Sequence, residues 1–157
     1  MNINDKDAGF YMVPVGGGAA SGVAAGSGDN TEALGAIVDM QAHDGLRSGV
    51  IAVFGVAVLA DGKTLALNDL KIEHGDEDDL SDAVDYEYFS APADNAAVAT
   101  GATGGSTEGI AFKQRVNFQG VKRYWRVSVT PDLDATGTDT FALGFGVVAI
   151  GQEAPAV

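Results

Sequence analysis

The chain has 157 residues, no cysteine and a formal net charge of −13; at this length about two thirds of the unfolded chain's surface can be buried, so we expect one domain with a core of its own. The lack of cysteine excludes disulfides, thiolate metal ligands and cysteine nucleophiles. The acidic charge argues against nucleic acid as a partner, because a negative field repels phosphate.

Residues 1–29 are predicted to form an extended, flexible N-terminal arm. Residues 1–7 lack the basic region and apolar core of a secretion signal, so we expect no export. Residues 9–28 are almost wholly Gly, Ala, Ser and Val, which bury little surface and lose much backbone entropy on ordering. The segment is either a disordered tail or an arm that becomes ordered against a neighbouring subunit. Its candidate interface residues are Phe10, Tyr11, Met12, Val13 and Val15.

Residues 30–157 are predicted to form a β-sandwich domain. Residues 31–40 are either a short helix capped by Asn30 or a strand that enters the domain. Residues 49–60 form the longest apolar run. Because a membrane-spanning helix needs roughly 20 residues, we interpret this run as a buried strand and expect no membrane contact.

A turn at residues 60–63, with Asp-Gly at its centre, separates this strand from a second one at residues 64–74. In the second strand, two leucines at odd positions precede the pair Asn68-Asp69, and two apolar residues at even positions follow it. Alternate residues of a strand point to opposite faces. We therefore predict a bulge at Asn68-Asp69 that switches the buried face.

An acid-rich stretch at residues 76–87 resembles a calcium loop at its ends. Asp76, Asp78 and Glu87 stand at the first, third and twelfth positions of such a loop. Leu80, however, stands at the fifth position, where an oxygen ligand belongs. We interpret the stretch as a solvated acidic turn with no metal, and a weak divalent-cation site is the alternative.

No catalytic motif is evident. The two histidines, His43 and His74, lie in unrelated contexts, and neither belongs to a serine or carboxylate motif. The glycine runs are not phosphate loops, because no Lys-Ser or Lys-Thr follows them. We therefore expect no enzyme activity and no cofactor.

Residues 121–150 are predicted to form a β-hairpin with strands at 122–129 and 141–150. Trp125 is the only tryptophan of the chain. Alternation places Trp125 and the two valines that follow it on the core face, whereas Lys122, Tyr124, Arg126 and Ser128 point outward.

The outward face of this strand is a candidate interface, formed by Lys122, Tyr124 and Arg126. Arg and Tyr are enriched among residues that carry interfacial binding energy, and Arg binds carboxylates through two parallel hydrogen bonds. The alternative is a solvated face whose basic groups pair with the abundant carboxylates of the same chain.

Short strands at this spacing, with Gly-rich turns and no long helix, predict an all-β fold, either an antiparallel β-sandwich or a jelly-roll-like barrel. The order of elements over about residues 39 to 155 resembles small virion proteins of tailed bacteriophages. Those proteins similarly have a Gly-x-Lys-Arg-Tyr-x-Arg strand, found here at residues 120–126, then a Thr/Gly loop and a terminal apolar strand. The Gly/Ala-rich segment before Asn30 and the dense acidic loop depart from the pattern.

This resemblance implies a virion structural protein, specifically a capsid decoration (cement) protein at the capsid surface, assembled in the host cytoplasm. Its implied partners are the major capsid protein and further copies of itself, with trimers favoured by the local threefold positions of icosahedral lattices. A tail or neck component is an alternative. So is a carbohydrate-binding or receptor-binding accessory module, for which Tyr86, Tyr88 and Asp85 are the candidate residues.

Overall fold

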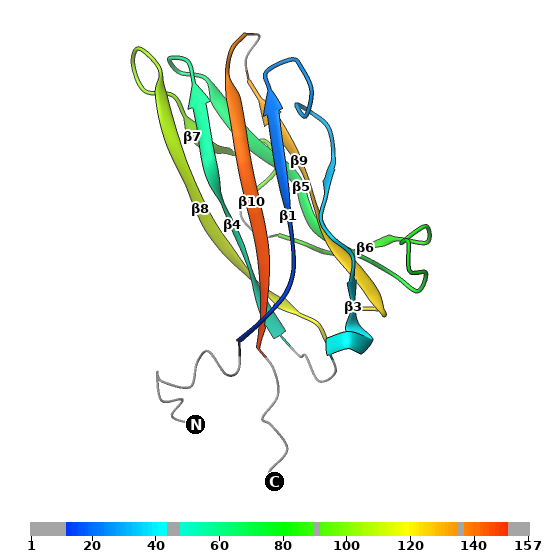
Figure 1. Cartoon of the computed structure of the whole chain (residues 1–157). Coiled ribbons are helices and arrows are strands. Elements are labelled where there is room, and N and C mark those ends of the chain that lie inside the picture. The colour runs from blue at the N-terminus through cyan, green and yellow to red at the C-terminus, as the bar shows by residue number, and fades with distance from the viewer. Residues whose placement is uncertain (1–11, 44–47, 90–91, 135–136, 151–157) are drawn as a thin grey trace, which may run out of the picture.

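The computed structural model describes residues 12–43, 48–89, 92–134 and 137–150 (Figure 1). Within these ranges the chain forms ten strands and one short 3-10 helix. In chain order they are β1 (Met12–Val23), β2 (Ala33–Leu34), β3 (Val38–Asp39), η1 (Met40–His43), β4 (Ser48–Leu59), β5 (Thr64–Gly75), β6 (Val84–Tyr88), β7 (Ala97–Thr100), β8 (Ser106–Asn117), β9 (Tyr124–Leu133) and β10 (Thr140–Ile150). No helix in the described ranges is long and apolar enough to cross a membrane.

The strands form two antiparallel sheets. Sheet A has the order β1-β10-β4-β8, and sheet B has the order β2-β9-β5-β6, in which β3 also pairs with β9 and β7 with β5 (Figure 1). β2 and β3 can be counted as one interrupted strand, and so can β6 and β7. Consecutive strands then lie in opposite sheets, except for β5 and the β6/β7 strand, which both lie in sheet B. This is the connectivity of a jelly roll. The predicted all-β sandwich or jelly-roll-like barrel is confirmed.

The predicted hairpin at residues 121–150 is wrong in its pairing, although both of its strands exist. β9 pairs with β5 in sheet B, whereas β10 pairs with β1 and β4 in sheet A. The connection between them crosses from one sheet to the other, as does the turn at residues 60–63 between β4 and β5. Each of these strands has an apolar face toward the core, and two such faces are buried together when the strands lie in opposite layers of a sandwich.

Part of the segment expected to be an arm, residues 1–29, is a strand of the sandwich. β1 pairs with β10 from end to end, with one bulge. Small residues allow this close packing, because a side chain at Gly18 would overlap the ring of Phe145 and one at Gly22 would overlap the ring of Phe141. The apolar contacts that order β1 therefore come from β10 of the same chain.

The core forms around Trp125, as the alternation along β9 predicts. Trp125 and the two valines on the same face of β9 are buried. The Trp125 ring lies 5.0 Å from that of Phe118, measured between centroids, and its Nε1 lies 3.0 Å from Sδ of Met40. Ser128 is also buried, although alternation directs it outward, because Glu32 covers it and accepts a hydrogen bond from its hydroxyl at 2.8 Å.

The predicted bulge in the second strand is confirmed. The pairing register of β5 with β9 shifts between Asn68 and Lys71, and Asp69 adopts a φ of +47°. Leu67 before the bulge and Leu70 after it are both buried despite their opposite parity. The short polar side chains of Asn and Asp tolerate such a left-handed backbone better than most residues do.

Candidate interaction surfaces

The outer face of sheet B carries a network of ion pairs. Glu73 on β5 accepts a hydrogen bond from Nε of Arg126 at 2.9 Å, and it lies 3.3 Å from Nζ of Lys71. Lys71 also lies 2.8 Å from Asp85 on β6. Although burial opposes its charged form, hydrogen bonds to Asp85 and Glu73 raise the pKa of Lys71 above its ordinary value. The network thus links β9, β5 and β6, and its central carboxylate, that of Glu73, is buried.

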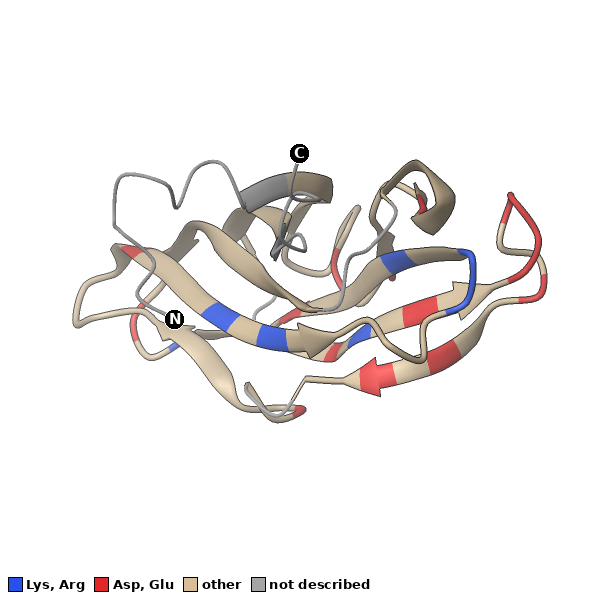
Figure 2. Cartoon of the chain, turned by 90° about the horizontal axis from the view of Figure 1, so that it is seen from below, with Lys and Arg blue, Asp and Glu red and all other residues tan. Residues whose placement is uncertain are grey.

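The acidic loop after β5 is held by Lys122, which precedes β9. Nζ of Lys122 lies 2.8 Å from Asp76 and 3.7 Å from Asp82. Figure 2 shows the acidic residues gathered on this loop, beside the basic residues at the start of β9. Hydrogen bonds from the backbone N–H groups of Asp76 and Glu77 lower the pKa of Asp82. In the described part of the chain, no group of three or more acidic residues or histidines could hold a metal ion.

The candidate interface residues of the β9 region are therefore engaged within the chain. Lys122 and Arg126 have the ion-pair partners just described, and Tyr124 is half-buried with the Arg123 guanidinium 4.8 Å from its ring centroid. This geometry matches the alternative of intramolecular pairing. A subunit contact through these three residues stays a prediction.

The candidate residues near the N-terminus fall into three groups. Val15 is buried in the core, with 8% of its surface exposed. The backbones of Met12 and Val13 pair with β10. Phe10 and Tyr11 lie outside the described residues.

His74 is half-buried at the end of β5, between charged neighbours. Its Nδ1 accepts a hydrogen bond from the backbone N–H of Lys122 at 3.1 Å, and its ring lies 4.9 Å from that of Tyr86. Burial, together with the Lys122 charge, lowers the pKa of His74 below its ordinary value of 6.5, and the carboxylates of Asp76 and Asp82 oppose the shift. His74 therefore supports the fold in its neutral form.

We expect the free energy of unfolding to decrease as the pH falls below about 6.5. The unfolded chain binds a proton at His74 near that pH, whereas the folded chain binds it only at lower pH, so protonation favours unfolding. Urea unfolding at pH values from about 8 to 5 measures this dependence. In His74→Asn, whose amide oxygen can still accept the Lys122 N–H, the dependence between about pH 7 and 5 should become weaker; an unchanged slope would contradict the assignment to His74.

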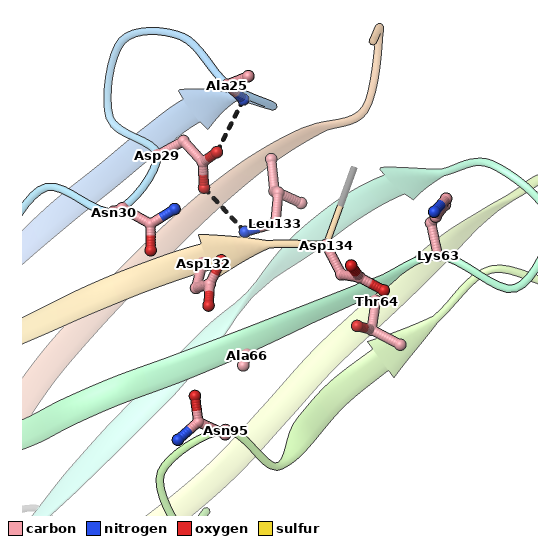
Figure 3. A pocket seen from close by; sticks show the side chains of 10 residues that line it. All are labelled: Ala25, Asp29, Asn30, Lys63, Thr64, Ala66, Asn95, Asp132, Leu133 and Asp134. Carbon is pink, nitrogen blue, oxygen red and sulfur yellow. Dashed lines mark hydrogen bonds between the residues drawn. The ribbon is translucent and has the colours of Figure 1, made fainter. Parts of the chain in front are cut away.

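A depression lies at the outer side of sheet B and is shown in Figure 3. It has a volume of about 700 Å³ and is open to solvent. Asp29 at its rim accepts hydrogen bonds from the backbone N–H of Ala25 at 2.7 Å and of Leu133 at 2.8 Å. This carboxylate therefore joins the loop after β1 to the end of β9.

The depression has little of what a sugar site needs. Its lining residues, shown in Figure 3, include no aromatic side chain. Of the tyrosines considered for sugar binding, Tyr86 donates its hydroxyl to the backbone oxygen of Asn117 at 2.9 Å, and Tyr88 donates to Asp85 at 2.6 Å. The hydroxyls of both tyrosines are thus engaged within the chain.

The outer face of sheet A is apolar, and we call it the apolar face. On β4, the side chains of Phe54, Val56 and Val58 point outward with 56%, 47% and 47% of their surface exposed. These three form a ridge. Beside it on β10 run Ala142, Gly144 and Gly146, which pair with Val56, Phe54 and Ala52 respectively and form a low track that we call the glycine track.

Charge is distributed unevenly around the molecule. Among the described side chains of sheet A that point outward, none is acidic, although the chain carries 22 Asp and Glu residues. The charged ones are Lys113 and Arg115, both on the edge strand β8, whose basic bands are visible in Figure 2. The apolar face is thus a broad surface of the described molecule without negative charge.

The sequence contained a signal for this face that the alternation argument did not use. Residues 49–60 are apolar at both parities, a pattern typical of strands that are covered on both sides. In the structure, only the odd positions of β4 face the core, and the described part of the chain leaves Phe54, Val56 and Val58 at even positions exposed.

Comparisons with known proteins give no family. No protein-family description and no curated protein matches the chain. Among solved structures, the chain is similar to the structure of infectious bursal disease virus Gx strain, with 13% identity and a TM-score of 0.45, over 91% of this chain and 33% of that one. The Gt strain of the same virus gives 12% identity and a TM-score of 0.46, over 92% of this chain and 34% of that one. The chain thus spans about one third of the length of these viral chains.

Proposed function

We propose that this chain is a structural protein of a virus particle, and specifically a capsid decoration protein of a tailed phage. The observation that carries the proposal is the apolar face: a strand with half-exposed Phe54, Val56 and Val58 in a sheet that presents no acidic side chain outward. Exposed apolar surface of this extent marks a contact site for another macromolecule. A rigid domain with a broad contact face suits a protein that acts by assembly.

The fold supports the same role by analogy. The jelly roll is a recurrent architecture of viral capsid domains, although lectins and cupins also use it. The order of strands around the segment 120–126 also resembles small virion proteins of tailed phages, as described above. Attachment to a capsid lattice requires only modest affinity at each site, because a protein bound through several contacts gains from their high effective concentration. The major capsid protein is the proposed partner.

The test is to locate the chain on purified particles. Virions from a host that carries the gene are purified, analysed by mass spectrometry, and labelled with antibodies raised against the recombinant chain. The proposal expects many copies per particle and antibody label on the head. Label on the tail or neck would identify a different virion component, and absence of the chain from the particles would overturn the structural role.

A further inference from the structure

We infer that the apolar face is the contact between two copies of this chain, packed face to face about a two-fold axis. The inference rests on the proposed assembly role and deepens it by naming the occupant of the face as a second copy. Three features carry it: the relief of the face, the distribution of charge, and the area available.

The relief of the face is a ridge beside a lower strand. β4 and β10 are the two central strands of sheet A, and they carry the ridge and the glycine track. The Phe54 ring already lies over Gly144, where a Cβ atom would come within 2.7 Å of it. At Gly146 a Cβ atom would meet nothing within 4 Å, so this part of the track is open. The ridge therefore lies beside a strand of small residues, which Phe54 covers at Gly144 and which is open at Gly146, beside Ala52.

A two-fold axis makes this arrangement fit. An axis that lies in the contact plane, parallel to the strands and between β4 and β10, exchanges these two strands between the copies. Because this rotation leaves positions along the strands unchanged, each residue of β4 lies over its own β10 pairing partner in the other copy, Phe54 over Gly144 and Val56 over Ala142. The contact uses the same patch twice, as an isologous interface requires. The same rotation places β8 of one copy over β1 of the other.

Charge favours the same pairing. Two copies of a chain with a net charge of −13 repel each other, so a stable contact must keep their carboxylates apart. The apolar face does so, since the described side chains on it include no Asp or Glu. The rotation also places Lys113 and Arg115 of one copy opposite the uncharged outer positions of β1 in the other. Among the described residues, no like charges meet at the contact.

The area of the face suits a stable dimer. Three of its four strands, β1, β4 and β8, are each 12 residues long. With about 3.4 Å per residue and about 4.8 Å between strands, the face measures roughly 19 Å by 41 Å, or about 780 Å². Each partner of a standard protein interface buries about 800 Å².

Sedimentation equilibrium of the full chain across the micromolar range tests the inference. The wild-type chain should have the mass of two chains. Phe54→Glu, which places a charge on the ridge, should weaken the dimer at least tenfold in Kd. Leu34→Glu is the matched control, because Leu34 is an exposed apolar strand residue outside the apolar face, 46% exposed on β2; this variant should dimerise as the wild type does. Circular dichroism verifies that each variant is folded.

Gly146→Leu separates a shaped contact from general stickiness. The added side chain has space in the single chain and increases the apolar surface, so nonspecific association would become stronger. The two-fold axis places Ala52 of the second copy over this position, and the added side chain would push it away, so we expect the dimer to weaken at least tenfold in Kd. Tighter association of Gly146→Leu, or an unchanged Kd for both face variants, would overturn the inference.

The remaining outcomes distinguish this inference from the proposed function. A wild-type chain that stays monomeric, or that has the mass of three chains, overturns the two-fold contact. If such a chain is nevertheless found on particle heads, the virion role stands and only the occupant of the face is wrong. If the chain dimerises through the apolar face but is absent from particles, the dimer stands and the virion role fails.

Discussion

Replacing Trp125 by alanine is expected to lower the free energy of unfolding by about 3 to 5 kcal/mol, the usual cost of truncating a buried aromatic side chain. Trp125 is fully buried between the two sheets, against Phe118 and Met40. Its loss leaves a cavity between the two sheets. The sheets cannot approach each other to close this cavity, because the close-packed strands around it hold them apart. Urea unfolding followed by far-UV circular dichroism measures the effect without relying on the fluorescence of this only tryptophan.

Trp125→Phe is the matched control for this prediction. It retains a flat apolar ring against Phe118 and loses the indole Nε1 beside Sδ of Met40. We expect it to cost clearly less than the alanine variant, because the cavity is smaller. A loss below about 1 kcal/mol for Trp125→Ala would mean that the ring does not fill the core as described.

Replacing Gly18 by valine is the second large effect, with an expected loss of about 1 to 3 kcal/mol or more from overpacking. Gly18 lies on the inner side of β1, where a Cβ atom would overlap the Phe145 ring and lie 2.9 Å from Cα of Gly35. The ring would have to leave its position between the sheets. The same urea titration, at protein concentrations low enough to keep the chain monomeric, measures the loss.

Ala19→Val tests the same strand from its other side. Ala19 is exposed, and a β-branched residue suits an exposed strand position, so we expect little change in the free energy of unfolding. The pair also distinguishes a strand from an arm: if the first 29 residues formed a separate flexible segment, both variants would unfold as the wild type does. A neutral Gly18→Val would therefore contradict the place of β1 in the sheet.

The buried faces of several strands could be predicted from residue order alone. Trp125 lies in the core because alternate residues of a strand point to the same side. The bulge at Asn68-Asp69 follows from the change in parity of the apolar residues around it, and the structure confirms both the shift in register and the switch of face. These predictions succeed because each depends only on neighbours along the chain.

The two main errors concern partners that are far apart in the sequence. A pair of apolar strands joined by a loop, at residues 121–150, is typical of a hairpin, yet β9 and β10 belong to different sheets. The Gly/Ala-rich composition of residues 9–28 is typical of a flexible segment, yet β1 is ordered by Phe141 and Phe145, more than a hundred residues later in the chain. In both cases the deciding contact lies outside any local window.

For the two candidate contact surfaces, too, the sequence shows the residues, and the tertiary structure decides which of them are engaged within the chain. The basic residues Lys122 and Arg126 stand out in an acidic sequence, but the tertiary structure pairs them with Asp76 and Glu73 of the same chain. The apolar face is less conspicuous in the sequence, because its ridge on β4 looks like part of a strand buried on both sides. Only the finished sheet shows that nothing in the described chain covers it.

The sequence by itself determined that this protein is an all-β domain, where most of its strands lie, and which side of several strands is buried. These properties follow from residue type and a period of two, which act within a few residues. The tertiary structure decided which sheet each strand joins, that β1 completes sheet A, and which apolar residues remain exposed. Those outcomes depend on which strands can share backbone hydrogen bonds and fill one core together, and this is a property of the whole chain.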